Sequence, residues 1–348
     1  MKSTSIPDHP LEVVWDITYA CPLRCVHCYS ESGRRPTRQL RHDDMLRAAD
    51  AIIAMGPGGV CLAGGEPLLV RGVFDVAARI TSAGIPVSLF TSGWNLKRET
   101  AETALRTFAS VSISMDGASA AVHDRIRGRR GSFHKAIDAA ALLSQISTKM
   151  EEVGERSPGF GVDYVAVRSN FHQIEEFVTE IAPRFPALNH LSFGAVVPEG
   201  LASRKGFADH ELLPDDLVRC LGEVEFAHRL QALAPPTVKI TTTDNLALQM
   251  HPDLIRDGVF APILQIEPDG LVRAMAAYEG TVGSVLTDAP AELWQRAVQR
   301  WHHPFVVETL KPVRTMKQWA EATRLIDHRF ASEIDRRRID RRPAYEPV

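Results

Sequence analysis

Three cysteines that lie close together near the start of the chain are the feature that most limits which fold and which kind of site it can form. Cys21, Cys25 and Cys28 have the spacing C-x3-C-x2-C, and the remaining cysteines, Cys61 and Cys220, lie far from them in the sequence. Soft thiolate ligands suit iron–sulfur chemistry. Three thiolates on one short loop can therefore hold three corners of a cubane [4Fe–4S] cluster. The fourth iron is then free to bind a substrate or cofactor.

The cysteines also allow two simpler interpretations. A structural zinc site needs four closed ligands, usually supplied as two spaced pairs. His27 is the nearby fourth candidate, but it stands between two of the cysteines, where tetrahedral closure would be strained. The second alternative is three unrelated thiols. Neither accounts for the other motifs described below, so we prefer the iron–sulfur interpretation.

The amino-acid composition is that of an ordinary soluble globular protein. Its 348 residues are 45% hydrophobic and 24% charged, with a net charge of −3, which gives no reason to expect nucleic-acid binding. The cysteines form no paired pattern of a secreted disulfide scaffold. Residues 1–10 contain no apolar signal-peptide core, and no apolar run approaches the ~18–20 residues of a membrane span. We expect a cytoplasmic protein without membrane contact.

The first 200 residues alternate short apolar segments with amphipathic ones. We predict strands over residues 11–18, 59–63, 87–91, 111–115, 161–167 and 191–197. We predict helices over residues 41–55, 70–82, 96–108, 133–143 and 174–181. Alternating strands and helices indicate parallel βαβ units. Six units are too few to close an eight-stranded barrel, so we predict an α/β fold with a partial (β/α)6 TIM-like barrel.

The chemically suggestive residues follow the ends of the predicted strands. The cysteines come after the first strand and Gly64–Pro67 after the second. Thr91–Gly93 and Asp116 come after the third and fourth. Active sites of such folds lie at the carboxyl ends of the parallel strands. The sequence therefore predicts one site that gathers these motifs at one rim.

The cysteine spacing, and the aromatic Tyr29 directly after the last cysteine, resemble the radical S-adenosylmethionine (SAM) enzymes. The resemblance implies one [4Fe–4S] cluster and SAM as cofactors, with Tyr29 near them. In that family a GGEP segment binds the amino group of SAM, which implies this role for Gly64, Gly65, Glu66 and Pro67. Glycine allows close backbone approach to a ligand, but an ordinary βα turn is the alternative interpretation.

Further segments resemble the same family. Ser92 stands where the family has an asparagine that contacts SAM, and Ser114 and Asp116 lie in an S-x-D-G segment that meets the ribose. Arg127 matches an arginine that pairs with the SAM carboxylate in the branch that modifies peptides and natural products. The strand that contains Val167 is expected to line the adenine. The alternatives are a turn residue for Asp116, a surface charge for Arg127 and plain core for Val167.

The pattern changes after residue 200, so we predict a core domain over residues 11–200 and a smaller α+β region over 201–348. We predict helices over residues 215–230, 291–301 and 316–334, a strand over 238–243, and a hairpin over 265–275. The hairpin turn Pro268–Gly270 resembles the start of the auxiliary-cluster (SPASM or twitch) region. Ala274 and Met275 stand where that region usually continues into Pro-Cys. We expect the hairpin to survive without a second cluster.

The resemblance implies reductive cleavage of SAM and hydrogen abstraction from a substrate, with one electron from an external donor such as flavodoxin or ferredoxin. Without a second cluster we expect epimerisation, elimination, rearrangement or decarboxylation. If the reaction is an epimerisation, Cys61 and Cys220 are the candidate thiol hydrogen donors, although each is more simply a core residue. Glu199, after the sixth strand, is a candidate substrate contact or a simple turn residue.

The sequence leaves two substrate classes open, a small natural-product intermediate and a ribosomal peptide. The chain places only ten residues before the first strand, which leaves no room for a fused leader-peptide-binding domain, so we favour a sugar, nucleoside or other small natural-product intermediate. The alternative is maturation of a ribosomal peptide by epimerisation or crosslinking. A further alternative is a non-catalytic binding protein on a radical SAM scaffold. The arginines at positions 336–342 are expected to be a solvated end that can also bind an acidic partner.

Overall fold

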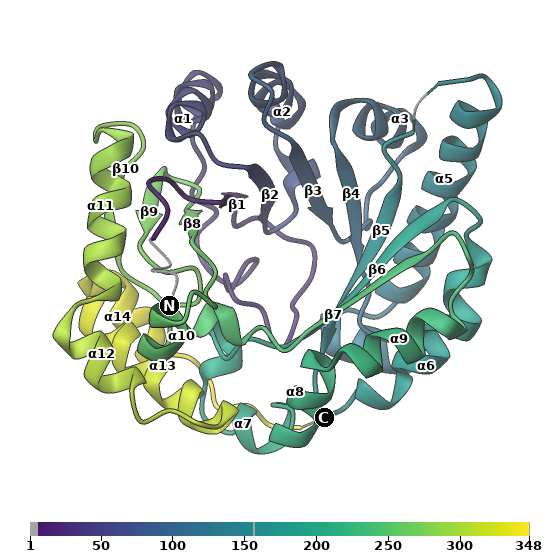
Figure 1. Cartoon of the computed structure of the whole chain (residues 1–348). Helices are drawn as coiled ribbons and strands as arrows, with labels where there is room; N and C mark the ends of the chain where they lie inside the picture. Colours follow the sequence, from purple (N-terminus) through teal and green to yellow (C-terminus); the bar gives the residue numbers. More distant parts are fainter. Residues whose placement is uncertain (1–5, 156, 348) are drawn as a thin grey trace.

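The strands pair side by side in one sheet, in the order β10-β9-β8-β1-β2-β3-β4-β5-β6-β7 (Figure 1). The computed structural model describes residues 6–155 and 157–347. Its strands are Glu12–Thr18 (β1), Gly59–Gly64 (β2), Val87–Thr91 (β3), Ser110–Ser114 (β4), Phe160–Ala166 (β5), Leu188–Ala195 (β6), Lys239–Thr243 (β7), Ile263–Ile266 (β8), Leu271–Arg273 (β9) and Thr281–Ser284 (β10). Strands β1 to β7 run parallel, β8 runs parallel to β1, and β9 and β10 are antiparallel additions.

Helices connect and cover these strands. Those of the N-terminal part are His42–Met55 (α1), Val73–Ser82 (α2), Arg98–Thr107 (α3), Ala120–Arg127 (α4), Ser132–Glu152 (α5) and Ile174–Glu176 (α6). The others are Phe207–His210 (α7), Asp215–Gly222 (α8), Val224–Leu233 (α9), Pro252–Arg256 (α10), Pro290–Trp301 (α11), Pro304–Leu310 (α12), Met316–Phe330 (α13) and Glu333–Asp340 (α14). Within the described residues, no helix combines the length and the apolar character that a membrane crossing requires.

The parallel strands curve into an arc with α1, α2, α3 and α5 on its convex side (Figure 1). The arc is a partial barrel, because β7 and β10 stand at opposite ends of the strand order and are not paired with each other in the described part of the chain. The expected partial (β/α) barrel is therefore confirmed. It is wider than six strands, since β7 and β8 extend the parallel part on either side.

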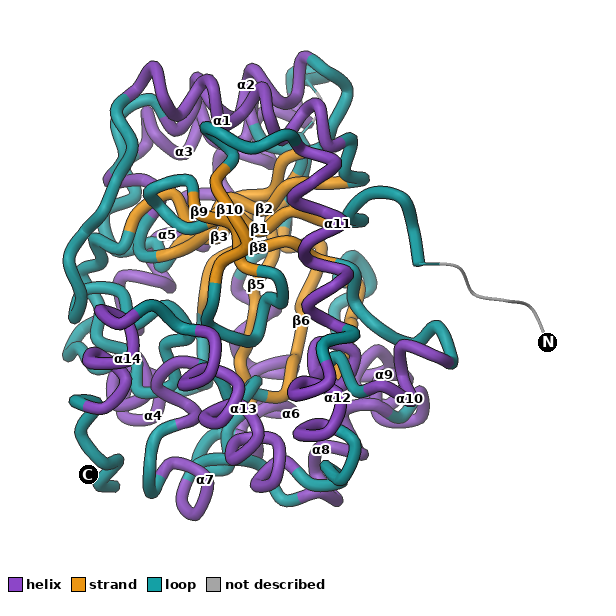
Figure 2. The backbone as a smooth tube through the Cα atoms, turned by 90° about the vertical axis from the view of Figure 1, so that its left-hand side faces the viewer, coloured by secondary structure: helices purple, strands orange, loops and turns teal. Residues whose placement is uncertain are grey.

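Figure 2 shows the C-terminal helices α13 and α14 at the opposite end of the molecule from α1 and α2. The predicted division at residue 200 is not visible as a break in the sheet, because β7 and β8 lie beyond that residue and still pair with β6 and β1. The two-domain division stays a prediction. The C-terminal helices border the concave side of the arc, where the cysteine loop also lies (Figure 1).

Alternation of side chains along the strands builds the core. In β1, Val13, Trp15 and Ile17 point to the side covered by helices and are at most 1% exposed. Near the other end of the arc, Phe193 of β6 packs against Tyr164 of β5, with ring centroids 5.4 Å apart. Phe177 completes this aromatic cluster at 6.3 Å from Phe193. Such tilted and edge-to-face contacts are favourable arrangements of buried aromatic rings.

The structure corrects several sequence predictions of local structure, among them the helix predicted over residues 215–230, which is divided into α8 and α9. Helix α5 continues to Glu152 instead of ending at residue 143, because Ile146 and Met150 extend its buried face into a segment whose polar residues resembled a loop. The long helix predicted over residues 316–334 is two helices, since Ser332 caps the start of α14 with its side chain. Helix α4, which carries Arg127, was not predicted at all.

The aromatic cluster gives a direct test of the packing. We expect Phe193→Ala to lower the free energy of unfolding by about 3–5 kcal/mol, because it removes a fully buried ring and leaves a cavity. Equilibrium urea denaturation measures the change. The exposed Val153→Ala serves as the control and is expected to change stability by less than about 0.5 kcal/mol. Equal effects of the two substitutions would contradict this account of the core.

Candidate active site

A cavity of about 390 Å³ opens at the carboxyl ends of the parallel strands. Cys21, Cys25 and Cys28 all line it, together with residues from the ends of β2, β3 and β4. Strands β1, β5 and β8 contribute the remaining sheet residues. The strand ends therefore converge as the sequence predicted, and the cysteine loop forms one wall of the space they enclose.

Helix α4 holds the cysteine loop in place through backbone hydrogen bonds. The amides of Arg24 and Val26 donate to the carbonyls of Arg127 and Ile126, at 3.1 and 2.8 Å. Gly128 ends the helix with a positive φ of 64°, and a Cβ atom there would lie 2.2 Å from the carbonyl oxygen of Arg24. Glycine is therefore required for this close approach.

Burial affects the ionisation of two of the three cysteine thiols in the loop. Burial raises the pKa of Cys21 to about 12 and that of Cys25 to about 11, so these thiols stay protonated until a metal binds and displaces the proton. In the described residues, no three His, Cys, Asp or Glu side chains are arranged to hold one metal ion. The three thiols nevertheless line one cavity, as the iron–sulfur interpretation requires.

Asp116 connects the cysteine loop to the sheet. Its fully buried carboxylate lies 2.9 Å from Nε2 of His27 and 2.6 Å from Nε of Arg127, and it accepts a hydrogen bond from the amide of Val165. Burial alone would raise the pKa of Asp116, but the charge of Arg127 and the contact with His27 hold that pKa well below its ordinary value. The guanidinium of Arg127 also reaches to 3.9 Å from Sγ of Cys25.

Glu66 is a second buried carboxylate that connects segments of the site, here the ends of β2 and β3. Its carboxylate, on a residue that is 1% exposed, accepts hydrogen bonds from the Thr91 hydroxyl at 2.7 Å and from the amide and hydroxyl of Ser92 at 2.9 and 2.5 Å. The preceding Gly65 is confined, because a Cβ there would lie 2.1 Å from the carbonyl oxygen of Ala20. The GGEP segment thus packs tightly against the start of the cysteine loop.

Tyr29 bridges the loop to β1 and β2. Its hydroxyl donates to Oδ1 of Asp16 at 2.6 Å and accepts from the amide of Gly64 at 3.2 Å. The other carboxylate oxygen of Asp16 accepts from the Gln265 side chain at 2.8 Å. Burial raises the pKa of Asp16 to about 6, although these hydrogen bonds and the charge of Arg273 oppose the rise.

The predicted site residues divide into two groups. The cavity wall contains Cys21, Cys25, Cys28, Tyr29, Gly64, Gly65, Ser92, Ser114, Arg127 and Glu199. The wall does not include Glu66, Pro67, Asp116 and Val167. Glu66 and Asp116 instead bind the residues that do line it, and Val165 faces the cavity where Val167 was expected. The roles of all these residues toward SAM stay predictions.

The structure adds polar residues that the motifs did not reveal. Asp163 of β5 lines the cavity, its Oδ2 has no hydrogen-bond partner among the described residues, and burial raises its pKa to about 6. Glu199 is partly exposed as a residue, yet its Oε2 is sealed from solvent without a partner, and burial raises its pKa to about 8. Buried polar atoms without partners at a cavity are candidate contacts for a ligand.

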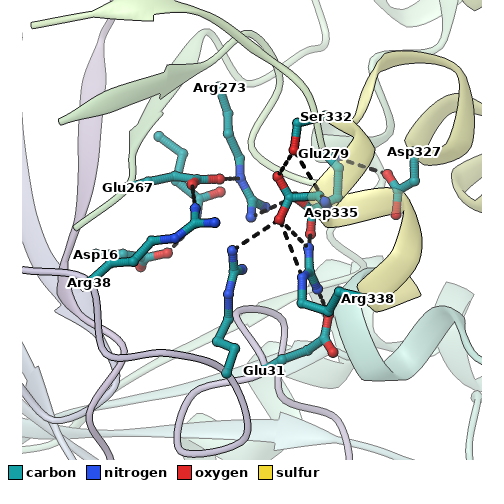
Figure 3. Close-up of polar contacts among 12 residues, drawn as sticks. Asp16, Glu31, Arg38, Glu267, Arg273, Glu279, Asp327, Ser332, Asp335 and Arg338 are labelled. Carbon is teal, nitrogen blue, oxygen red and sulfur yellow. Dashed lines mark hydrogen bonds and ion pairs between the residues drawn. The ribbon is translucent and has the colours of Figure 1, made fainter. Parts of the chain in front are cut away.

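A buried network of charges joins the C-terminal part to the other side of the cysteine loop (Figure 3). Arg273 of β9 pairs with Glu267 at 2.8 Å and with Glu279 at 3.0 Å. Glu279 in turn binds Arg338 of α14 at 2.6 Å. Arg338 also pairs with Glu31, three residues after the last cysteine of the loop. Sequence periodicity does not reveal these contacts, since they join residues far apart in the chain.

The expected hairpin is present, with Gln265 opposite Arg273 and Ile266 opposite Val272. Ala274 and Met275 are buried at 1% and 3% exposure, and the carbonyl of Ala274 accepts from the indole of Trp301 at 2.6 Å. Apolar packing thus fills the position at which the resembled region usually continues into Pro-Cys.

Comparisons with known proteins agree with these motifs. Residues 15–150 match the model of the radical SAM superfamily. The mycofactocin maturase MftC of Mycolicibacterium smegmatis is 33% identical over 181 residues, which are 52% of this chain and 43% of that protein. The AdoMet-dependent heme synthase of Methanosarcina barkeri is 29% identical over 61% of this chain and 57% of its own length. The PqqA peptide cyclase of Rhodopseudomonas palustris is 28% identical over 49% and 43%.

The fold also matches a solved structure. SuiB of Streptococcus suis bound to S-adenosylmethionine superposes with a TM-score of 0.63 and 17% identity, over 82% of this chain and 66% of that chain. At this identity the match supports the fold alone. The chain spans about half the length of the curated relatives it matches. The resemblance drawn from the cysteine, GGEP and S-x-D-G segments is confirmed at the level of the superfamily.

The raised pKa of Glu199 predicts a pH-dependent stability. Between pH 4.5 and about 8 the unfolded chain has lost this proton while the folded chain keeps it, so the free energy of unfolding falls as pH rises through this range. We expect Glu199→Gln to remove this slope and to stabilise the cofactor-free protein by up to about 3 kcal/mol at pH 7, with little change at pH 4.5. Urea denaturation at several pH values measures it. The exposed Glu180→Gln is the control, and parallel profiles for both variants would contradict the prediction.

Proposed function

We propose that this chain, which carries a radical SAM domain, is an enzyme that reductively cleaves SAM and abstracts hydrogen from a substrate. The observation that carries the proposal is the presence of Cys21, Cys25 and Cys28 together in the wall of one cavity. The backbone of Gly64 and Gly65 lines the same cavity. Residues 15–150, which match the superfamily, include all of these positions.

The cysteine thiolates would hold a [4Fe–4S] cluster, and Gly64, Gly65, Ser92 and Ser114 would contact SAM. When bound, these cofactors supply one-electron cleavage of the sulfonium and a 5′-deoxyadenosyl radical that takes a hydrogen atom from the substrate. The protein contributes binding and orientation. Apolar side chains such as Phe90 in the cavity wall exclude water from the reacting atoms.

Arg127 has a position that suits two tasks. Its Nε is held by Asp116, while its terminal nitrogen faces Sγ of Cys25. A fixed positive charge beside a thiol favours the thiolate that a metal needs. The predicted pairing with the SAM carboxylate remains compatible, because the ion pair with Asp116 uses one edge of the guanidinium. Asp116 is therefore a positioning residue in this proposal.

Asp163, Glu199 and Gln265 are the polar groups that would orient a substrate. Glu199, with its pKa of about 8, would be a neutral hydrogen-bond donor at neutral pH, whereas Gln265 is held by Asp16. Together they can recognise amide or hydroxyl groups. Cys61 also lines the cavity, so it stays a candidate hydrogen donor, while the other candidate, Cys220, is absent from the cavity wall.

The names of the relatives favour a peptide substrate over the sugar or nucleoside that we first preferred. A maturase and a peptide cyclase are among them, and a SuiB structure contains a precursor peptide. The heme synthase keeps a small-molecule substrate as the second candidate. We therefore propose peptide modification, with residues 11–200 carrying the chemistry and an external flavodoxin or ferredoxin supplying the electron.

The cluster assignment predicts the effect of removing one thiol. Cys25→Ala is expected to abolish the brown colour of anaerobically purified protein and the cleavage of SAM under reduction with dithionite, because one of three cluster ligands is lost. Absorbance and chromatographic detection of 5′-deoxyadenosine measure both effects. The matched control Cys220→Ala removes a thiol on α8 outside the cavity and should retain colour and cleavage.

Persistence of SAM cleavage in Cys25→Ala would show that the cluster assignment is wrong. A colourless wild-type protein that ignores SAM would instead support the binding-protein alternative. Loss of colour in Cys220→Ala as well as in Cys25→Ala would indicate a general folding defect, which circular dichroism of the two variants would reveal.

The substrate class is tested by isotope transfer. Reduced enzyme and SAM are incubated with an extract of deuterium-grown producing cells, divided by size into peptide and small-molecule fractions. We expect deuterium in 5′-deoxyadenosine from the peptide fraction, detected by mass spectrometry, because the abstracted hydrogen comes from the substrate. The Cys25→Ala protein is the control for non-enzymatic labelling. Label from the small-molecule fraction alone would contradict the peptide proposal and restore our first preference.

A further inference from the structure

A second cavity, of about 840 Å³, lies on the outer side of the cysteine loop. Its walls come from the loop and from α14 with the C-terminal tail. Nine arginines and three carboxylates line it. The chain as a whole has a net charge of −3, so this concentration of positive charge is a local feature and not a consequence of composition.

Some of the arginines are neutralised by the network that holds α14. Asp335 pairs with Arg35 at 3.4 Å, and Glu31 pairs with Arg342 at 2.7 Å. These contacts use two of the three carboxylates that line the cavity. The third, Glu346, lies in the exposed C-terminal tail. Carboxylates outside the cavity pair with Arg38, Arg125 and Arg337, so only part of the arginine charge in the cavity is without an ion pair.

Three arginines of the cavity, Arg34, Arg204 and Arg341, form no ion pair with a carboxylate of the described residues. Nε of Arg204 is buried and has no hydrogen-bond partner among the residues that the structure describes. Burial, and next the charge of Arg34, lower the pKa of Arg204 to about 10. Such crowding of like charges is relieved when an anion enters.

The cavity lies directly against the proposed cluster ligands. Arg34 donates hydrogen bonds to the carbonyls of Cys25 and Arg24, at 3.2 and 2.5 Å, and Val26 forms part of the cavity wall. An acidic group bound here would therefore be next to the cysteine loop. The reaction cavity shares no lining residue with it in the described chain, since the loop separates the two spaces.

We propose that this arginine cavity is the docking site for an acidic protein that carries single electrons. The inference rests on the proposed function, because only a chain that holds a reducible cluster needs such a partner. Complementary charge steers association and fixes orientation. The separation from the reaction cavity favours this partner over an acidic segment of the substrate, which would have to be continuous with the reacting group.

The step served by docking is a simple transfer. One electron leaves the reduced carrier, which is oxidised by one unit, and enters the iron–sulfur group that Cys21, Cys25 and Cys28 are proposed to hold. No bond forms between the two proteins. The carrier is a flavodoxin-type or ferredoxin-type protein with an acidic surface, and flavodoxin is the probe used below.

The test changes the two unpaired arginines that do not touch the cysteine loop. Arg204→Gln/Arg341→Gln should raise the Kd of flavodoxin for the cofactor-loaded enzyme about tenfold at low salt, as expected from the loss of about 1.4 kcal/mol. The flavodoxin-driven rate of SAM cleavage should fall similarly at limiting flavodoxin. Cleavage driven by dithionite, a small reductant that needs no docking site, should stay within about twofold of wild type. Arg184→Gln, an exposed charge outside the cavity, is the control.

Salt provides an independent readout. Wild-type affinity for flavodoxin should weaken steeply between about 0.05 and about 0.3 M salt, and the double variant should show a smaller slope. An unchanged Kd and unchanged flavodoxin-driven rate in the double variant would overturn the docking proposal. The docking proposal would also be overturned if the double variant lost affinity for a labelled poly-glutamate peptide but still bound flavodoxin normally. That result would indicate that the cavity is a peptide site.

The two proposals can fail separately. A wild-type enzyme that does not cleave SAM even with dithionite contradicts the proposed function, whatever its affinity for flavodoxin. A wild-type enzyme that cleaves SAM with dithionite, but whose double variant binds flavodoxin normally, contradicts the docking site alone. Equal loss of the dithionite-driven and flavodoxin-driven rates with unchanged Kd would also reject docking, since the substitutions would then act on the fold.

Discussion

The buried carboxylate of Asp116 determines where the cysteine loop lies. A fully buried charge is costly unless it is paired and hydrogen-bonded. Asp116 meets this requirement with His27 from the loop, Arg127 from α4 and the amide of Val165 from β5. Since these partners come from three different segments, satisfying the one charge brings the loop, a helix and the sheet together. The thiols at the carboxyl end of β1 thereby face a cavity instead of solvent.

A second set of charges fixes the same loop from the C-terminal side. Glu31 follows the cysteines and pairs with Arg342, which lies 311 residues further along the chain. The network continues through Glu279 to Arg273 on the hairpin (Figure 3). The hairpin resembles the start of the auxiliary-cluster region, and here packing around Ala274 and these ion pairs connect it to the rest of the C-terminal part.

The sequence allowed the partial barrel, the superfamily and the positions of the thiols to be predicted, because these depend on local signals. Strand alternation and the spacing of Cys21 to Cys28 can be seen within a few residues. What the sequence did not reveal depended on distant contacts. No local pattern shows that the carboxylate of Asp116 pairs with Arg127, or that Glu31 is linked to α14. The second, arginine-lined cavity needed the tail to fold back onto the loop, which composition alone cannot indicate.

The cysteine loop thus separates two environments with opposite requirements. Hydrogen abstraction needs a dry space, and the cavity on the inner side is lined by residues such as Phe90, Val165 and Leu248. Recognition of a soluble partner needs charge that solvent can reach, and the outer side offers unpaired arginines. Charged contacts hold the loop between these spaces from both sides, since His27 pairs with the buried carboxylate of Asp116 and Glu31 pairs with Arg342.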